Sequence, residues 1–280
     1  MLSRRACWWL LTTLGASEFI RKCAEGKSGR TTAIEAECPI TTQPNAGTTS
    51  MEIRIESLLA GAAHAVGVVA IIDVFRAFST AAEALANGAS RIIMVSTVEE
   101  ALALRADGTG QVCMGEVHGR APAGFDFGNS PFAVSKVDFL GKTIIQRTSA
   151  GTQGITAASH AQSLYAAALV TATATARCML AGNPDRITLV AMGKNALERT
   201  DEDELCALHL RNLLEGRPGN GDAVRQVILA AAEAARFRDP NPPHLHPGDL
   251  DIALDIDRHD FAIRVTLEDG HPVARMERTG

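Results

Sequence analysis

The distribution of apolar and polar residues predicts short strands that alternate with helices. Residues 66–75 (VGVVAIIDVF) form an almost unbroken apolar run, which is typical of a strand buried on both faces. Residues 51–58 (MEIRIESL) alternate between apolar and charged side chains, as a half-buried strand does. The same patterns predict strands at 91–96, 111–117, 142–148, 163–169 and 186–193, and helices at 81–89, 149–162, 171–182, 195–216 and 222–237. This order predicts an α/β fold, layered helix/sheet/helix, with a mostly parallel or mixed sheet.

Local signals add detail to this expectation. Thr97 precedes two glutamates, a pattern typical of a helix N-terminus. Residues 268–270 (EDG) predict the turn of a hairpin within residues 251–276. In addition, residues 70–97 and 143–170 share a strand, a turn with arginine and hydroxyls, an Ala-rich helix and a short strand. An ancient duplication would explain this faint repeat, and so would the ordinary rhythm of α/β proteins.

Residues 1–50 differ from the rest of the chain. The opening MLSRR and the apolar stretch after it resemble a signal peptide, and the Gly/Ser/Thr-rich remainder predicts disorder. Two explanations are open: a targeting segment followed by a linker, or a gene start assigned too early, with Met51 as the true first residue. We favour the second, because nothing in residues 52–280 requires secretion. The expected organisation is a disordered extension at 1–50 and an α/β domain at 51–280.

Charge and cysteine content narrow the function classes. A net charge of -5 and a pI near 5.9 argue against nucleic acid as a partner. The apolar stretch near the start is too short for a convincing membrane span, so no membrane partner is expected. The six cysteines form no C-x-x-C pair, which favours reduced thiols and a cytoplasmic location. The Ala-rich helices allow a homodimer without requiring one.

The clearest candidate chemistry is in residues 73–80 (DVFRAFST), directly after the most apolar strand. Asp73 would be costly to bury there unless it is paired or bound to a metal. Arg76 offers a planar fork for bidentate phosphate binding. Ser79 and Thr80 stand at an expected helix start, where free N–H groups favour phosphate. The alternative is a structural Asp–Arg pair beside an ordinary helix cap.

Two further loops carry candidate residues. Glu116 ends the strand predicted at 111–117 and is either a hard-oxygen ligand for Mg²⁺ or a solvated loop carboxylate. Residues 124–131 (GFDFGNSP) contain Asn129 and Ser130, and their glycines and proline predict a tight turn.

A second anion-binding turn is predicted at residues 146–152 (QRTSAGT). Arginine, hydroxyls and a glycine follow an apolar strand here, without the G-x-x-x-x-G-K pattern of a P-loop. Its candidate substrate-binding residues are Arg147, Thr148, Ser149, Gly151 and Thr152. The acidic run at 201–204 is either a solvated helix start or a source of metal ligands, namely Glu202 and Asp203.

Familiar phosphatase and metal signatures do not fit the sequence. The aspartyl-nucleophile pattern needs Asp two positions after Asp73, where Phe75 stands. Cys113 and Arg120 are one residue too far apart for the cysteine-phosphatase loop. His244 and His246 form an H-x-H pair, but no third ligand is near in the sequence, which favours loop histidines that bind no metal.

Taken together, these segments resemble the 2-phosphosulfolactate phosphatase family. The matching stretches occur in the family's order over roughly residues 52–275, and their combination is specific although each is weak alone. They are IIDVFRAFST with ALANGA (71–89), GE (115–116), GFDFGNSP (124–131), RTSAGT (147–152) and EDELCA (202–207). One departure stands out: the family commonly reads TTNGT where this chain has TSAGT, so Ala150 lacks an amide, while Arg147 adds a positive charge.

The resemblance implies an α/β phosphatase that uses Mg²⁺ to hydrolyse 2-phosphosulfolactate, a small anionic phosphomonoester, to sulfolactate and phosphate, a step toward coenzyme M. Our hypothesis is that Asp73 holds the metal, with Glu116 or Glu202 and Asp203 as further ligands, and that Arg76 helps to neutralise the phosphoryl oxygens. The expected substrate-binding residues are Ser79, Thr80, Asn129, Ser130 and the turn at 147–152. A phosphatase for another small phospho-acid and a non-catalytic anion-binding protein remain as alternatives.

Overall fold

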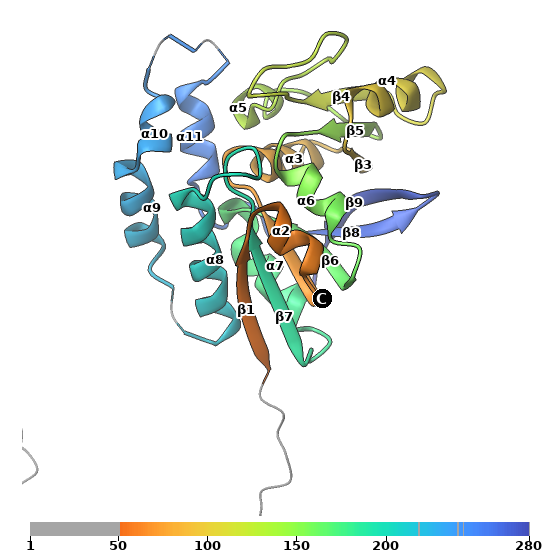
Figure 1. Ribbon diagram of the computed structural model, residues 1–280. Helices are drawn as coiled ribbons and strands as arrows, with labels where there is room; N and C mark the ends of the chain where they lie inside the picture. The colour runs from red at the N-terminus through yellow and green to blue at the C-terminus, as the bar shows by residue number, and fades with distance from the viewer. Residues whose placement is uncertain (1–50, 218, 240, 243, 280) are drawn as a thin grey trace, which may run out of the picture. The chain divides into compact units, whose positions relative to one another are not determined.

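A nine-stranded mixed sheet organises the part of the chain that the computed structural model describes, residues 51–217, 219–239, 241–242 and 244–279 (Figure 1). The expectations for residues 1–50 lie outside this part. The strands are β1 (Glu52–Ser57), β2 (Gly67–Ile72), β3 (Arg91–Val95), β4 (Val112–Gly115), β5 (Thr143–Arg147), β6 (Ala161–Ala167), β7 (Arg186–Ala191), β8 (Ala262–Glu268) and β9 (His271–Glu277). They lie in the order β1-β7-β2-β6-β8-β9-β3-β5-β4. Among these nine described strands, every antiparallel pair involves β8 or β9, which confirms the mostly parallel sheet.

Helices cover both faces of this sheet. They are α2 (Leu58–His64), α3 (Ala77–Ala86), α4 (Val98–Ala106), α5 (Pro131–Val134), α6 (Gly151–Ala157), the 3₁₀ turn η1 (Leu169–Thr171), α7 (Ala172–Leu180), α8 (Asp201–Leu214), α9 (Gly221–Ala230), α10 (Ala232–Arg236) and α11 (Pro247–Ala253). One core cluster lies under α2, α3 and α6, and a second lies under α7 to α11. Neighbouring residues Ile71 and Ile72 of β2 enter opposite clusters, as strand pleating requires. The predicted helix/sheet/helix layering is therefore confirmed.

Local signals in the sequence identified several elements correctly. The Thr97 hydroxyl accepts a hydrogen bond of 3.1 Å from the N–H of Glu100 and caps α4. Asp269 and Gly270, with φ of 50° and 83°, form the tight turn between β8 and β9. The expected helix at 222–237 is instead two helices, because Ala231 adopts an extended conformation with ψ of 159°.

The two segments of the faint repeat have the same order of elements and interlock. The first consists of β2, α3 and β3, and the second of β5, α6 and β6. Strand β2 pairs with β6, and β3 pairs with β5, so each segment pairs with the other rather than with itself. The N-termini of α3 and α6 also meet. Gly151 is so close to Ala77 that an added Cβ would lie 2.8 Å from the Ala77 Cβ. Duplication remains a prediction, which this reciprocal pairing supports.

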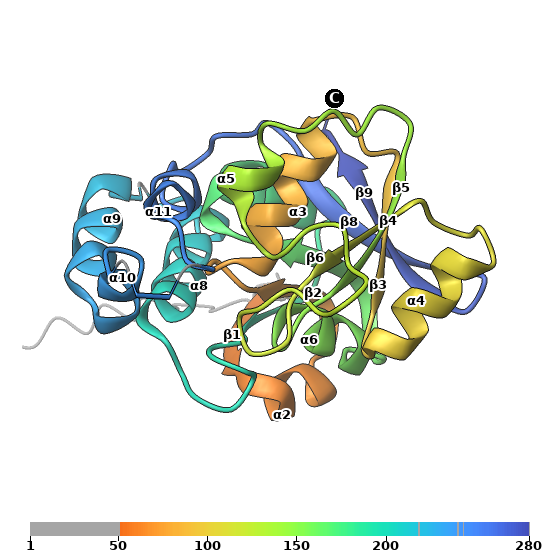
Figure 2. The same cartoon turned by 90° about the horizontal axis from the view of Figure 1, so that it is seen from above.

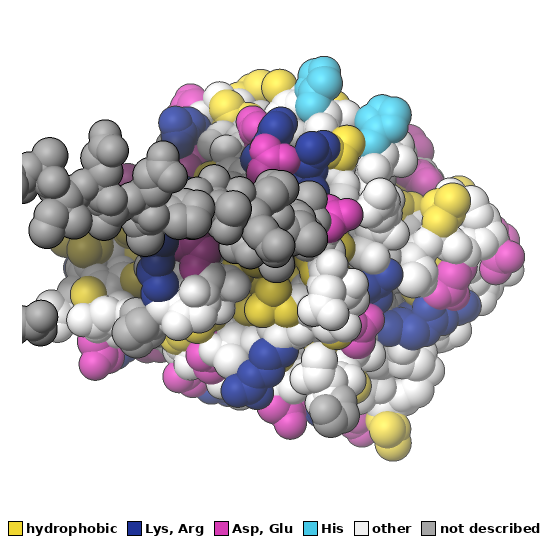
Figure 3. Space-filling model, turned by 90° about the horizontal axis from the view of Figure 1, so that it is seen from below, with side chains coloured by type: hydrophobic (Ala, Val, Ile, Leu, Met, Phe, Trp, Pro, Cys, Tyr) yellow, Lys and Arg dark blue, Asp and Glu magenta, His cyan; other side chains and the backbone are white. Residues whose placement is uncertain are grey.

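Helices α8 to α11 gather at one end of the sheet and α4 lies at the other, as Figures 1 and 2 both show. On the face seen in Figure 3, acidic and basic side chains are interspersed over the visible described surface. None of the described helices combines the length and the apolar character that a bilayer crossing requires. The described cysteines, Cys113, Cys178 and Cys206, are buried and unpaired with one another.

Candidate active site

A cavity of about 240 Å³ lies where the carboxyl ends of several strands meet. Asp73 follows β2, Glu116 follows β4, Ser149 follows β5 and Lys194 follows β7, and all four line the cavity. Strands β2 and β5 lie on different sides of the β8–β9 hairpin in the sheet order, yet their following loops converge here. The edge of the sheet at which parallel strands end is the usual ligand-binding edge of α/β proteins.

Asp73 joins the N-termini of two helices. Its Oδ1 accepts a hydrogen bond of 3.0 Å from the N–H of Ala77 in α3, and its Oδ2 accepts one of 2.8 Å from the N–H of Gly151 in α6. The side chain is only 6% exposed. Burial raises the pKa of Asp73 to about 6; the bond from Ala77 opposes this rise, and the charge of Glu116 adds to it. Asp73 is thus held in place by two backbone N–H groups, but these do not fully compensate the cost of burying its negative charge.

Arg76 reaches the cavity from the loop after β2 and is held by α11. Its Nη1 donates 2.7 Å to Asp249 Oδ2 and 2.8 Å to the carbonyl of His244, and both members of the Arg76–Asp249 ion pair are buried. Asp249 also accepts a 2.5 Å bond from the hydroxyl of Ser130. The expected arginine therefore lies at the site, but its counter-ion is Asp249 rather than Asp73.

Glu116 fixes the shape of the opposite wall. Its Oε1 accepts 2.5 Å from the N–H of Ser149, and its Oε2 accepts 2.6 Å from the N–H of Gly119. The neighbouring Arg147 donates to the carbonyls of Glu116, at 2.8 Å, and Ser96, at 3.2 Å. Glu116 is buried, so the alternative of a solvated loop carboxylate is wrong. Its oxygens already hold two loops together.

The acidic start of α8 contributes two buried carboxylates with different surroundings. Asp203 accepts 2.8 Å bonds from the N–H groups of Val74 and Gly193, and so ties the loop after β2 to the loop after β7. Glu202 lines the cavity, and its buried Oε2 has no hydrogen-bond partner among the described residues. Burial raises the pKa of Glu202 to about 7. The solvated-helix alternative is therefore wrong for both residues, although Asp201 is exposed.

The structure brings six of the predicted site residues together around the cavity: Asp73, Arg76, Glu116, Asn129, Ser149 and Glu202. The remaining ones, Ser79, Thr80, Ser130, Arg147, Thr148, Gly151, Thr152 and Asp203, are not among its lining residues. Ser79 donates 2.8 Å to the carbonyl of Val74, and Thr148 and Thr152 bond to each other's backbone N–H. Their geometry is that of groups that shape the turns, and substrate contact by them stays a prediction.

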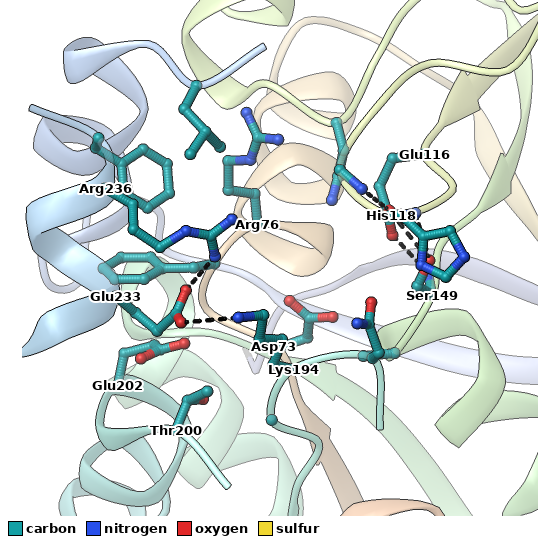
Figure 4. Close-up of a pocket in the computed structure, with 18 of the residues that line it drawn as sticks. Asp73, Arg76, Glu116, His118, Ser149, Lys194, Thr200, Glu202, Glu233 and Arg236 are labelled. Carbon is teal, nitrogen blue, oxygen red and sulfur yellow. Dashed lines mark hydrogen bonds and ion pairs between the residues drawn. The ribbon is translucent and has the colours of Figure 1, made fainter. Parts of the chain in front are cut away.

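Sequence reasoning missed several residues that line the cavity. Figure 4 shows Lys194, Glu233 and Arg236 along the wall opposite Glu116 and Ser149, with His118 beside Ser149. Glu233 and Arg236 belong to α10, which the sequence analysis predicted only as part of a helix at 222–237. No local pattern marks these residues, because their neighbours in space come from distant parts of the chain.

The donor set fits a magnesium ion without forming a complete metal centre. Within the described residues, no group of three His, Cys, Asp or Glu side chains is arranged to hold a metal. Magnesium is usually held by one or two carboxylates, with water and substrate phosphate completing its shell. Asp73 and Glu202 share the cavity, both with raised pKa values, and Glu202 has an unpartnered oxygen. A bound cation would compensate these carboxylates.

Comparisons with known proteins agree with the resemblance in the sequence. The family model described as 2-phosphosulpholactate phosphatase matches residues 55–242. A protein of Bacillus subtilis is 30% identical over 212 residues, which are 74% of this chain and 90% of that protein. A protein of Thermotoga petrophila is 34% identical over 166 residues, which are 59% of this chain and 71% of that protein. Both are named "Probable 2-phosphosulfolactate phosphatase". The resemblance is thus confirmed, and the chain belongs to the 2-phosphosulfolactate phosphatase family, a family of phosphoric monoester hydrolases.

Proposed function

We propose that this protein is a Mg²⁺-dependent phosphatase that hydrolyses 2-phosphosulfolactate to sulfolactate and phosphate. The observation that carries the proposal is the position of Asp73, a buried carboxylate at the junction of two helix N-termini, in one cavity with Glu202 and Arg76. The names of the relatives support the reaction. A role on the way to coenzyme M and a cytoplasmic location follow as expectations, the latter in keeping with the free thiols of the three cysteines that the structure describes.

In this proposal, Asp73 and Glu202 hold the metal, which when bound would offset negative charge on the phosphoryl oxygens. Glu116 and Asp203 position the surrounding loops through the backbone N–H groups that they bind. Arg76 is fixed by Asp249 and presents a guanidinium to the same cavity. A preorganised cation of this kind stabilises charge in a transition state without reorganisation.

Hydrolysis forms a bond from the oxygen of water to phosphorus and breaks the bond from phosphorus to the substrate's C2 oxygen. That oxygen takes up a proton and leaves as the hydroxyl of sulfolactate. Asn129 lines the cavity, and its amide N–H groups can donate hydrogen bonds to oxygen atoms of the substrate, whereas the hydroxyl of Ser149 donates to Glu116. The Oδ1 atom of Asn129 is buried without a partner among the described residues.

The direct test is phosphate release by the full chain from 2-phosphosulfolactate, 2-phospholactate and p-nitrophenyl phosphate, each with Mg²⁺ and with EDTA. We expect Mg²⁺-dependent release with the highest kcat/KM for 2-phosphosulfolactate. Preference for another ester would retain the reaction class and reject the substrate. Absence of release from all three by folded protein would reject the proposal.

A further inference from the structure

Three charged residues from two elements form a chain along one wall of the cavity. Glu233 of α10 lies between Lys194, which follows β7, and Arg236 of the same helix (Figure 4). The Lys194 Nζ is 3.4 Å from Glu233 Oε1, and Arg236 forms an ion pair with Glu233 Oε2. The two cationic side chains are 41% and 46% exposed. We refer to these three residues as the Glu233 bridge.

The Glu233 bridge holds the cations that a ligand in this cavity could most readily reach. Arg76 is only 4% exposed and already donates to Asp249. Arg147, which the sequence suggested as a second anion-binding arginine, donates instead to backbone carbonyls and does not line the cavity. Among the described lining residues, Lys194 and Arg236 are therefore the exposed cations.

The charge of the cavity explains why these cations matter. Its lining contains four carboxylates, Asp73, Glu116, Glu202 and Glu233, and three basic groups, Arg76, Lys194 and Arg236, so it carries 3 − 4 = −1 when all are ionised and the histidines are neutral. A phosphate ester with a second anionic group would add more negative charge. Such a substrate needs cations that are not already neutralised by Glu233.

We propose that Lys194 and Arg236 bind a second anionic group of the substrate, a carboxylate or sulfonate, and that Glu233 is an internal competitor displaced by it. Glu233 offers the two cations the same chemistry as the ligand, two oxygen acceptors. Exposed ion pairs contribute little stability, so exchange of one carboxylate for another costs little. The planar fork of arginine suits carboxylate and sulfonate oxygens alike. A phosphate ester of a neutral alcohol gains nothing from the exchange.

This inference rests on the proposed function, because it specifies the substrate of the same site. It makes Lys194 and Arg236 specificity determinants that act on substrates with a second anion. It also predicts that removal of Glu233 changes KM in the opposite direction to removal of either cation, because both cations are then free to bind the substrate. Such a sign difference is not expected of residues that only support the fold.

The test compares R236Q, K194M and E233Q in the full chain, with kcat and KM measured for 2-phosphosulfolactate, 2-phospholactate and p-nitrophenyl phosphate. We expect R236Q and K194M to raise KM for the doubly functional substrates about three- to tenfold more than KM for p-nitrophenyl phosphate. We expect E233Q to lower KM for the former about threefold. If the variants raise KM for 2-phospholactate as much as for 2-phosphosulfolactate, the bound group is the carboxylate. If they raise KM only for 2-phosphosulfolactate, the bound group is the sulfonate.

Matched controls come from an exposed ion pair on α8 and its C-terminal cap, outside the cavity. Glu215 lies 3.0 Å from Arg211 and 2.9 Å from Arg217, so R211Q and E215Q remove the same charges from a comparable three-residue arrangement where no substrate is expected. Equal effects of R236Q on all three substrates would overturn the inference. So would loss of activity in E233Q together with a higher Mg²⁺ concentration for half-maximal activity, because Glu233 would then act as a metal ligand.

A binding measurement separates this inference from the proposed function. Calorimetric titration with sulfolactate needs no turnover, so it decides the inference even if the wild-type chain releases no phosphate. We expect weaker binding by R236Q and K194M and tighter binding by E233Q than by the wild type. Absence of sulfolactate binding by the wild type, or identical affinities in all variants, would overturn the inference.

Discussion

The carboxylate of Asp73 accepts a 2.8 Å hydrogen bond from the backbone N–H of Gly151, which is 78 residues away in the sequence. The contact places the end of β2 against the start of α6 and so joins the two halves of the faint repeat. A Cβ at position 151 would lie 2.9 Å from Asp73 Oδ2. The glycine of the TSAGT turn therefore serves close packing around the carboxylate.

We expect D73N to abolish activity while leaving the fold intact. The amide can still accept one of the two N–H bonds, but it loses the charge that would hold a cation. The loss in kcat/KM should be about 10²-fold or more. Phosphate release measured with saturating Mg²⁺ tests this, with circular dichroism as the check on folding. Retention of Mg²⁺-dependent turnover would show that Asp73 is not a metal ligand.

We expect G151A to lower both stability and activity. The added methyl group would meet Ala77 Cβ at 2.8 Å and Asp73 Oδ2 at 2.9 Å, so the two helix starts must separate. Overpacking of this kind costs about 1–3 kcal/mol in the free energy of unfolding. The control is G182A, where an added Cβ meets nothing within 4 Å. Equal urea midpoints for the two variants would contradict the packing argument.

We expect D249N to destabilise the protein by about 3 kcal/mol and to reduce activity. It removes the counter-charge of Arg76 from a buried pair and leaves the guanidinium uncompensated. E215Q breaks ion pairs with the exposed arginines Arg211 and Arg217 and should cost less than about 1 kcal/mol per pair. Chemical denaturation of both variants measures the difference, which should vanish if Asp249 only caps α11.

We expect the metal-free protein to lose stability as pH rises from about 4 to 7. The folded-state pKa values of Asp73 and Glu202 are raised to about 6 and about 7, above those of the unfolded chain. The folded state therefore binds more protons than the unfolded state in this window, and stability falls with increasing pH. Thermal unfolding in EDTA at successive pH values tests the sign. A rising midpoint would contradict it, and excess Mg²⁺ should flatten the curve.

The sequence was sufficient for most of the fold because buried parallel strands appear as apolar runs. Strands β2 and β7 lie within the predicted ranges 66–75 and 186–193. The break at Ala231 was missed because alanine favours helix and no glycine or proline marks the bend. Helix α11 was missed as well, although Pro247 at its first turn and Asp249 two residues later are recognisable starting signals.

Part of the cavity lining could be predicted because some of its residues are marked by the local sequence. Asp73, Arg76 and Glu202 each stand at the end of a strand or the start of a helix, so their positions could be inferred from the pattern. The Glu233 bridge could not, since it depends on how α10 lies beside the loop after β7. The role of Arg147 could not be predicted either. From the sequence alone, its N–H groups could donate to a ligand, whereas in the structure they donate to the carbonyls of Ser96 and Glu116.

The position of the β8–β9 hairpin has a consequence for biosynthesis. The strand pairing between the sets β1-β7-β2-β6 and β3-β5-β4 runs through β8 and β9, whereas helices α3 and α6 and the Asp73–Gly151 bond join the sets at the carboxyl ends of the strands. The ribosome delivers residues 262–277 last among the strands. Asp73 follows a strand of the first set and Glu116 a strand of the second, so the sheet beneath both carboxylates becomes continuous only after the last two strands have been synthesised.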